Sequence, residues 1–414
     1  MLPTGRLSHD GWGDAASEGL LTQENGATWV VFPKGRKDLR EADFISCRGG
    51  RRAGRQQGGQ VLGHAHRGAI RHPARPPIRA VGPLIVPVGT ASPRRVASGA
   101  VNTFLVTGGA GFIGSHLCDR LLAEGKKVVA VDDLTTGRIA NLVVARGYGQ
   151  QFTFHNMDIR LEELRTVFER HRPEVVMHLA AQASVPTSVE DPERDASVNV
   201  MGLLNVLECA AATGTRKVVF AASGGTLYGE PKSIPVKEGA RNRARPISPY
   251  GISKAIALDY LSFYQRTRTV DFAALALANV YGPRQDPFGE AGVIAIFAAK
   301  MLAGETPTIF GDGGQTRDFV FVDDTVHAFS LAADRGAGAV LNVGTGVETT
   351  VNGLFELMAA TAQFRGSASY GPERPGDLRR NALDPSLAEK ELGWRPWTSL
   401  EEGLKATVEA LRPS

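Results

Sequence analysis

The sequence predicts an α/β fold built on a parallel β-sheet with helices on both faces. From residue 101 onward, short apolar segments alternate with longer segments of helical periodicity, as in successive βαβ units. A glycine-rich turn joins the first strand to the first helix, and an acidic residue closes the second strand. Together these observations favour a Rossmann-type, doubly wound parallel sheet with a smaller mixed α/β lobe at its C-terminal end.

Strands and helices are expected to alternate over residues 101–280, the sheet domain. Strands buried on both faces form near-continuous apolar runs, whereas amphipathic helices repeat apolar residues every three to four positions. These criteria predict strands at 103–107, 127–132, 151–155, 174–179, 216–222 and 271–277, and helices at 112–124, 160–171, 193–212 and 250–267.

The alternation ends near residue 280, where Pro283 and Pro287 indicate a loop. We expect 281–316 and 345–414 to form the smaller lobe, while about 317–344 return to the sheet domain. The helices expected in this part of the chain are 291–303, 323–333, 352–362, 385–392 and 400–411.

Residues 1–100 have the composition of an extension rather than a domain. They hold 15 Lys and Arg against 7 Asp and Glu, and only 28–32 and 84–88 resemble strands. A segment so rich in Gly, Arg and Pro buries too little apolar surface to offset the entropy lost on ordering. We therefore expect a disordered extension, and a basic arm that binds nucleic acid is the alternative.

Cysteine usage and hydropathy indicate the compartment. Cys47, Cys118 and Cys209 are scattered, which fits neither a disulfide framework nor a metal site. We find no apolar run that approaches the roughly 18 residues needed to span a bilayer, and no apolar core of a signal peptide. We expect a cytoplasmic protein with no bound metal, no membrane contact and no nucleic-acid partner.

The glycine turn has the spacing G-x-G-x-x-G from Gly109 to Gly114. Glycines let the backbone turn tightly and approach a ligand, and the helix that follows directs free N–H groups and a positive dipole end at an anion. Asp132 closes the second strand at about the spacing of 20 residues that the motif requires. The context therefore predicts a dinucleotide site.

Tyr250 and Lys254 form a second candidate site at the start of an expected helix. Because they are four residues apart, both face one side of it. An ammonium near a phenol favours the phenolate, so we expect a lowered tyrosine pKa and a general base. Ser223 and Thr226 follow the strand at 216–222, and ligands of parallel sheets bind beyond the carboxyl ends of strands.

These motifs together resemble the extended short-chain dehydrogenase/reductase family, and within it the nucleotide-sugar 4-epimerases of the UDP-glucose type. The resemblance covers residues 101–414 and leaves residues 1–100 unmatched. The segments that carry it are 107–114, Asp132, 158–159, 178–182, Asn199, 223–229, Tyr250 with Lys254, 279–284, 311–318, 342–346 and 374–377.

The resemblance implies NAD as the cofactor. Asp132 should bind the adenosine ribose with help from Asp133, and its charge disfavours a 2′-phosphate. Lys254 should contact the nicotinamide ribose beside Tyr250. The other implied contacts are Gly108, Gly111, Phe112, Ile113 and Gly114 at the pyrophosphate, Asp158 and Ile159 at the adenine, Leu179, Ala180, Ala181 and Gln182 beside the nicotinamide, and Asn199.

The resemblance also implies a UDP-hexose as substrate and a reversible inversion at C4 through a 4-keto sugar. Tyr250 would act as the base. Arginine forks suit a diphosphate, and the implied substrate contacts are Ser223, Thr226, Tyr250, Asn279, Arg317, Arg374 and Asp377. Members of the family commonly form a homodimer, here through helices 193–212 and 250–267.

Two positions depart from the family pattern. Gly224 stands where many epimerases have a serine, so that Ser223 or Thr226 must supply the hydroxyl for the sugar O4, and Thr226 is favoured. Asn381 stands near a position where members selective for small hexoses often have a tyrosine. A smaller residue there leaves an N-acetylated sugar open as a substrate.

Other interpretations remain open. Nucleotide-sugar 4,6-dehydratases and decarboxylases are the alternative enzymes, although the dehydratases carry an Asp-Glu pair where 224–226 has none. A non-catalytic NAD-binding sensor is the alternative outside enzymes. For single residues, Asp158 could cap a helix, Asn199 could be a structural amide, Arg317 and Arg374 could be surface charges, and His178 is expected to be a core histidine.

Overall fold

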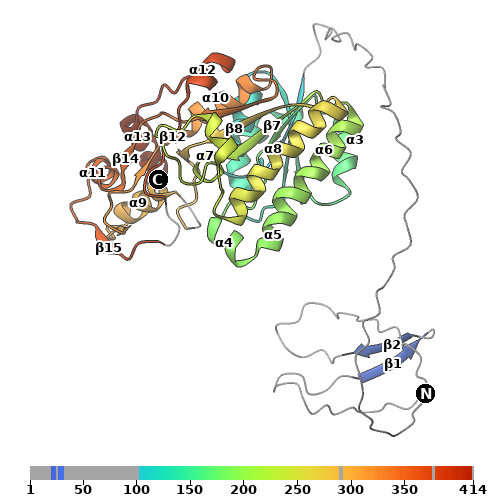
Figure 1. Cartoon of the computed structure of the whole chain (residues 1–414), viewed down its shortest axis with the longest axis horizontal. Helices are drawn as coiled ribbons and strands as arrows, with labels where there is room; N and C mark the ends of the chain where they lie inside the picture. The colour runs from blue at the N-terminus through green and yellow to red at the C-terminus, as the bar shows by residue number, and fades with distance from the viewer. Residues whose placement is uncertain (1–19, 25–26, 32–101, 289–291, 375–377, 413–414) are drawn as a thin grey trace, which may run out of the picture. The chain divides into compact units, whose positions relative to one another are not determined.

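The computed structural model describes residues 20–24, 27–31, 102–288, 292–374 and 378–412 (Figure 1). The chain divides into two units, Met1–Ser92 and Pro93–Ser414. In the first unit, β1 (Leu20–Glu24) pairs with β2 (Ala27–Val31) in antiparallel register. The strand expected at 28–32 is therefore part of a strand pair, and the one expected at 84–88 lies outside the described residues. Disorder in the rest of residues 1–100 stays a prediction.

The second unit is built on a seven-stranded parallel sheet with the order β13-β8-β7-β6-β3-β4-β5. Strand order reverses between β3 and β6, which is the point where doubly wound sheets bind ligands. The predicted fold class is confirmed. The strands are β3 (Thr103–Thr107), β4 (Lys127–Asp132), β5 (Phe152–Asn156), β6 (Val175–His178), β7 (Lys217–Ser223), β8 (Asp271–Leu277) and β13 (Ala339–Val343).

Helices cover both faces of this sheet (Figure 1). Alternate residues of β3 enter separate cores: Phe104 and Val106 join one hydrophobic cluster, and Leu105 joins the other. The first cluster includes residues of α1 (Phe112–Ala123) and α10 (Val322–Ala332). The second includes residues of α3 (Leu164–His171), α6 (Gly202–Thr213) and α8 (Pro249–Arg268).

One continuous helical stretch, Pro192–Thr213, precedes β7. It consists of α5 (Pro192–Ala196), a π-helical turn η3 (Ser197–Met201) and α6. Contrary to the sequence expectation, its length and composition are sufficient to cross a membrane, and it is the one such helix in the described part of the chain. It packs against α3 and α8 and buries Asp195 and Asn199, as a core helix of the sheet domain does.

The smaller lobe combines short strand pairs with helices. β10 (Thr308–Phe310) pairs with β15 (Ser369–Gly371), β11 (Thr316–Arg317) with β14 (Thr349–Thr350), and β9 (Asn279–Tyr281) with β12 (Phe319–Phe321). The predicted helices appear here as α9 (Val293–Leu302), α11 (Val351–Ala362), α12 (Ser386–Leu392) and α13 (Leu400–Leu411). The exact boundary between sheet domain and lobe stays a prediction.

A buried carboxylate joins the lobe to the sheet. Asp318, next to β12, is fully buried, and burial raises the pKa of its carboxyl. It accepts hydrogen bonds from the backbone N–H groups of Thr345, Gly346 and Leu383 and from the Thr345 hydroxyl. These bonds compensate the cost of burying the charge and fix the segment around Leu383 near the end of β7.

Candidate functional site

The glycine turn between β3 and α1 is packed so tightly that side chains cannot enter it. Gly108 has a φ of +68°, and a Cβ on Gly114 would lie 2.0 Å from the Gly108 carbonyl oxygen. Gly111 is the N-cap of α1 and provides no side-chain hydrogen bond to it. The first N–H groups of α1, at Phe112 and Ile113, therefore have no side-chain cap, as an anion site at a helix end requires.

Asp132 lies at the end of β4, directly beside this turn. Its carboxylate accepts hydrogen bonds from the Ala110 N–H at 2.9 Å and the Leu134 N–H at 2.8 Å. Burial raises the pKa of Asp132, while these two N–H groups act in the opposite direction. Asp133 is exposed and binds the Thr135 N–H. The structure therefore brings the predicted ribose carboxylate to the predicted pyrophosphate turn.

Asp158 and Ile159 follow β5 along the same edge of the sheet. Asp158 pairs with the Arg160 guanidinium, whose hydrogen bonds lower the pKa of the carboxyl. It does not cap a helix, because α3 begins only at Leu164. The Ile159 side chain is buried, and a Cβ on Gly202 would lie 2.6 Å from its Cδ1.

The segment after β6 is held by Thr107 of β3. The Thr107 hydroxyl accepts hydrogen bonds from the Leu179 and Ala180 N–H groups at 3.2 Å and lies 2.8 Å from His178 Nδ1. Burial lowers the pKa of His178 to about 3, so the ring is neutral. His178 is thus the satisfied core histidine that the sequence predicts. Ala181 continues this segment toward Gln182.

Asn199 fixes the next part of this segment, which we call the Gln182 loop (residues 179–184). Its Oδ1 accepts from the Gln182 N–H at 3.0 Å, and its Nδ2 donates to the Gln182 carbonyl at 2.9 Å. Nδ2 also donates to Asp195 at 2.8 Å. These bonds favour the structural reading of Asn199. Sequence reasoning missed Asp195. The feature that could have identified it is a carboxylate within a helix that is otherwise largely apolar.

Tyr250 and Lys254 lie together at the buried start of α8. Ser248 caps this helix by accepting from the Gly251 N–H at 3.1 Å, and Pro249 occupies its first turn. Lys254 Nζ donates to the Ala221 carbonyl at 2.9 Å and lies 5.7 Å from the Tyr250 ring centroid. Burial lowers the pKa of Lys254 to about 8.

The prediction of a lowered tyrosine pKa is wrong for this structure. Burial raises the pKa of Tyr250 to about 12, because the phenolate loses more solvation than the hydrogen bond from Ser223 restores. The sequence showed the neighbouring lysine but not the depth of burial. Deprotonation of Tyr250 near neutral pH therefore needs further stabilisation of the phenolate.

The hydroxyl groups after β7 differ in their surroundings. Ser223 ends β7 and hydrogen-bonds Tyr250, whereas the Thr226 hydroxyl, in the short helix α7 (Gly224–Leu227), is buried without a partner among the described residues. A Cβ on Gly224 would lie 2.4 Å from Leu383 Cδ1. Leu383 thus occupies the space that a side chain at position 224 would need, so a serine would not fit there without a shift of Leu383.

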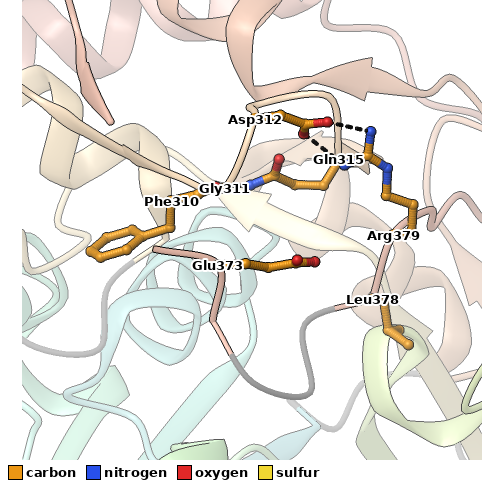
Figure 2. A pocket seen from close by; sticks show the side chains of 7 residues that line it. All are labelled: Phe310, Gly311, Asp312, Gln315, Glu373, Leu378 and Arg379. Carbon is orange, nitrogen blue, oxygen red and sulfur yellow. Dashed lines mark hydrogen bonds and ion pairs between the residues drawn. The ribbon is translucent and has the colours of Figure 1, made fainter. Parts of the chain in front are cut away.

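A pocket of about 160 Å³ lies in the smaller lobe. Figure 2 shows Phe310 at one end of it and the paired Asp312 and Arg379 at the other. Sequence reasoning gave none of its lining residues a role at the site, although three of them belong to the glycine-rich segment 311–318. They are Phe310, Gly311, Asp312, Gln315, Glu373, Leu378 and Arg379.

Two of the predicted substrate residues border this pocket. The Arg317 guanidinium donates to the Leu378 carbonyl at 2.7 Å, and the Arg374 guanidinium lies 4.1 Å from the Phe310 ring centroid. Asn279 is exposed at the start of β9, and Asp377 lies outside the described residues. Arg317 is therefore half-buried beside the pocket, whereas Arg374 is exposed and lies against Phe310 at its rim.

The described part of the chain contains no cluster of three or more side chains that could hold a metal ion. Its two cysteines, Cys118 and Cys209, are buried free thiols, and Cys47 lies outside the described residues. The groups predicted to act at the site are the turn at Gly108–Gly114, the pair Tyr250 and Lys254, and the hydroxyls of Ser223 and Thr226.

Residues 105–407 match the family model described as GDP-mannose 4,6 dehydratase. A UDP-glucose 4-epimerase from Mycolicibacterium smegmatis is 48% identical over 309 residues, which are 74% of this chain and 98% of the relative. The structure of a UDP-glucose 4-epimerase from Thermotoga maritima with UDP-glucose has a TM-score of 0.72 at 48% identity, covering 75% of this chain and 98% of that one.

The structure of a Thermus thermophilus UDP-glucose 4-epimerase in complex with NAD has a TM-score of 0.70 at 42% identity. The match covers 75% of this chain and 99% of that one. From the fold, the site and these similarities together, the chain belongs to the GDP-mannose 4,6 dehydratase family of NAD-dependent epimerases and dehydratases.

Proposed function

We propose that this protein is a UDP-glucose 4-epimerase that interconverts UDP-glucose and UDP-galactose with NAD as its cofactor. The observation that carries the proposal is the group formed by buried Tyr250 and Lys254 with half-buried Ser223, which lies at the same end of the parallel sheet as the glycine turn. The identity of 48% with epimerases that match nearly end to end supports it.

The residues present fit NAD. Side chains are excluded from the turn at Gly108 and Gly114, which leaves room for a pyrophosphate against the first N–H groups of α1. Asp132 would bind the adenosine ribose, and Lys254 the nicotinamide ribose. When bound, NAD accepts a hydride from C4 of the sugar and returns it to the other face of the 4-keto sugar.

Tyr250 would accept the proton of the sugar 4-hydroxyl on its phenolic oxygen. Its high pKa means that the phenolate must be stabilised, and the groups placed to do so are the Ser223 hydroxyl and the Lys254 ammonium. Thr226 has a buried hydroxyl free for a further hydrogen bond, which suits the sugar O4. Either Ser223 or Thr226 can thus serve the role of the missing serine.

The smaller lobe would hold the UDP portion of the substrate while the 4-keto sugar rotates and presents its other face to the cofactor. Arg317 and Arg374 lie at the rim of the lobe pocket and would neutralise a diphosphate. Asn279 and Asp377 are predicted to assist. Binding at the nucleotide keeps the reacting carbon near the cofactor without restricting rotation of the sugar.

The proposal is tested by incubating the purified protein with UDP-galactose and separating the products by chromatography. We expect UDP-glucose to form until the two sugars reach equilibrium. A 4-keto-6-deoxy product would instead indicate a dehydratase. In a separate incubation with a UDP-uronic acid, release of CO₂ would indicate a decarboxylase. NAD binding without any conversion would indicate a sensor.

The substrate range is predicted to include UDP-N-acetylglucosamine. Asn381 is buried, and its Oδ1 has no partner among the described residues, so the amide can accept a hydrogen bond from an N-acetyl group. Asn381→Tyr should reduce turnover of the acetylated sugar much more than that of UDP-glucose, because the larger ring would leave less room for the acetyl group. Equal turnover ratios in both proteins, or no wild-type turnover of the acetylated sugar, would contradict this prediction.

A homodimer through α8 and its neighbours is predicted as well. Exposed apolar side chains gather on α4 (Val185–Glu190), η3 and α8, and such clusters on a surface indicate a partner. Phe263→Glu should shift the protein to a monomer in light scattering after size-exclusion chromatography. Phe288→Glu, which changes an exposed side chain of the loop after β9, is the control. The exposed residues are Val185, Val189, Met201, Ile252, Ile256 and Phe263.

Wild-type protein that elutes as a monomer would contradict the dimer. A Phe263→Glu variant that remains a dimer would place the contact on another surface. Turnover measured on the same samples would show whether the monomer is active.

A further inference from the structure

Asp195 is a fully buried carboxylate at the end of α5 that the proposed mechanism does not use. Its Oδ1 accepts hydrogen bonds from Gln182 Nε2 at 3.1 Å and Asn199 Nδ2 at 2.8 Å. Its Oδ2 accepts from the Ser253 hydroxyl at 2.6 Å. A buried carboxylate is tolerated only when it is hydrogen-bonded in this way, so these three side chains are fixed around it.

The partners of Asp195 come from both sides of the candidate active site. Gln182 belongs to the loop after β6. Its Nε2 also donates to the Ser184 carbonyl, and its Oε1 accepts from the Ser184 N–H. Ser253 precedes Lys254 in α8 and lies in the same helical turn as Tyr250. Asp195 therefore connects the loop expected beside the nicotinamide to the helix that carries the base.

The charge of Asp195 also acts on the two reacting side chains. It raises the pKa of Lys254 against the larger opposite effect of burial, and it raises the pKa of Tyr250. The elements packed against α5 are α4, η3 and α8. The other ionisable groups of α5 and of these elements are exposed or lie farther along α8: Glu190, Asp191, Glu193 and Arg194, and the ionisable residues of 259–268.

We propose that Asp195 is a positioning residue, which holds the Gln182 loop and the start of α8 in one fixed arrangement and keeps a negative charge next to the helical turn of Tyr250 and Lys254. The part of this proposal that concerns turnover rests on the proposed epimerase function. The part that concerns the Gln182 loop requires only that the protein binds NAD.

Two substitutions in the full-length protein separate geometry from charge. Asp195→Asn keeps the size and an acceptor oxygen for Gln182 and Asn199, and its amide can donate to the Ser253 oxygen. It removes only the charge. We expect it to fold and bind NAD like the wild type. Its pH–activity profile should shift by about one unit to lower pH, because Lys254 and Tyr250 then both lose their protons more easily.

Asp195→Ala removes the charge and leaves three buried donors without their acceptor. We expect weaker NAD binding, measured by titration of protein fluorescence, and turnover reduced about 100-fold by misplacement of the loop and the helix. Asp191→Asn is the matched control, since it removes a charge from the same helix while an amide can still cap it. This variant should keep the wild-type profile.

The proposal would be overturned if both Asp195 variants had the same pH–activity profile and the same NAD affinity as the wild-type protein. If Asp195→Ala does not fold, the pH profile of Asp195→Asn decides it. If the wild-type protein does not convert UDP-galactose, the epimerase function fails, and the NAD affinity of Asp195→Ala still tests the link to the Gln182 loop. Unchanged affinity would then refute that link.

Discussion

Tyr250→Phe is expected to abolish turnover of UDP-galactose and leave NAD binding nearly intact. The change removes one oxygen, which is the proton acceptor of the proposed reaction, and keeps the ring in its buried position. Loss of a general base typically costs about 10²–10⁴ in rate. The measurement is the initial rate of UDP-glucose formation, together with NAD affinity from fluorescence titration.

Tyr264→Phe is the matched control for this variant. Tyr264 lies on the same helix, is also buried, and donates its hydroxyl to Glu208 away from the site. It should keep most of the activity, whatever it loses in stability. Turnover by Tyr250→Phe at a rate near that of the control would show that another group removes the proton.

Gly114→Ala is expected to eliminate NAD binding and, with it, all activity. The new Cβ would lie 2.0 Å from the Gly108 carbonyl oxygen, a distance that forces the turn and the start of α1 apart. The N–H groups that would contact the pyrophosphate then lose their common direction. Fluorescence or calorimetric titration with NAD measures the loss, and circular dichroism shows whether the fold persists.

Gly239→Ala provides the comparison, because a Cβ at this position has no atom within 4 Å. It should bind NAD like the wild type. A folded Gly114→Ala variant with wild-type affinity would mean that the dinucleotide does not lie in this turn.

The sheet was predictable because its strands are buried on both faces and stand out as apolar runs. All six strands predicted for residues 101–280 occur within about two residues of their expected ends. No strand was predicted at the position of β13, although residues 317–344 were expected to return to the sheet domain. The strand pairs of the smaller lobe are two or three residues long, which is too short for a periodic pattern. The helix predicted at 160–171 begins later because Asp158 and Arg160 form a turn.

The candidate site was predictable where its residues follow one another in the chain, as at Gly108–Gly114 and at Tyr250 with Lys254. Features that depend on tertiary contacts were not predictable. Each of them depends on contacts between segments that lie far apart in the sequence. Examples are the packing of Leu383 against Gly224, the burial that raises the pKa of Tyr250, and the hydrogen bonds of Asp195. The cytoplasmic location and the expected lack of nucleic-acid and membrane partners stay predictions.

The most direct test of the account follows the hydrogen at C4 of the substrate. The protein is incubated with UDP-galactose that carries deuterium at C4, and the UDP-glucose formed is analysed by mass spectrometry and NMR. We predict that the deuterium stays at C4 of the product, because the same hydride leaves and returns within one closed site. Product that has exchanged this deuterium for solvent hydrogen, or that lacks it for any other reason, would contradict the account.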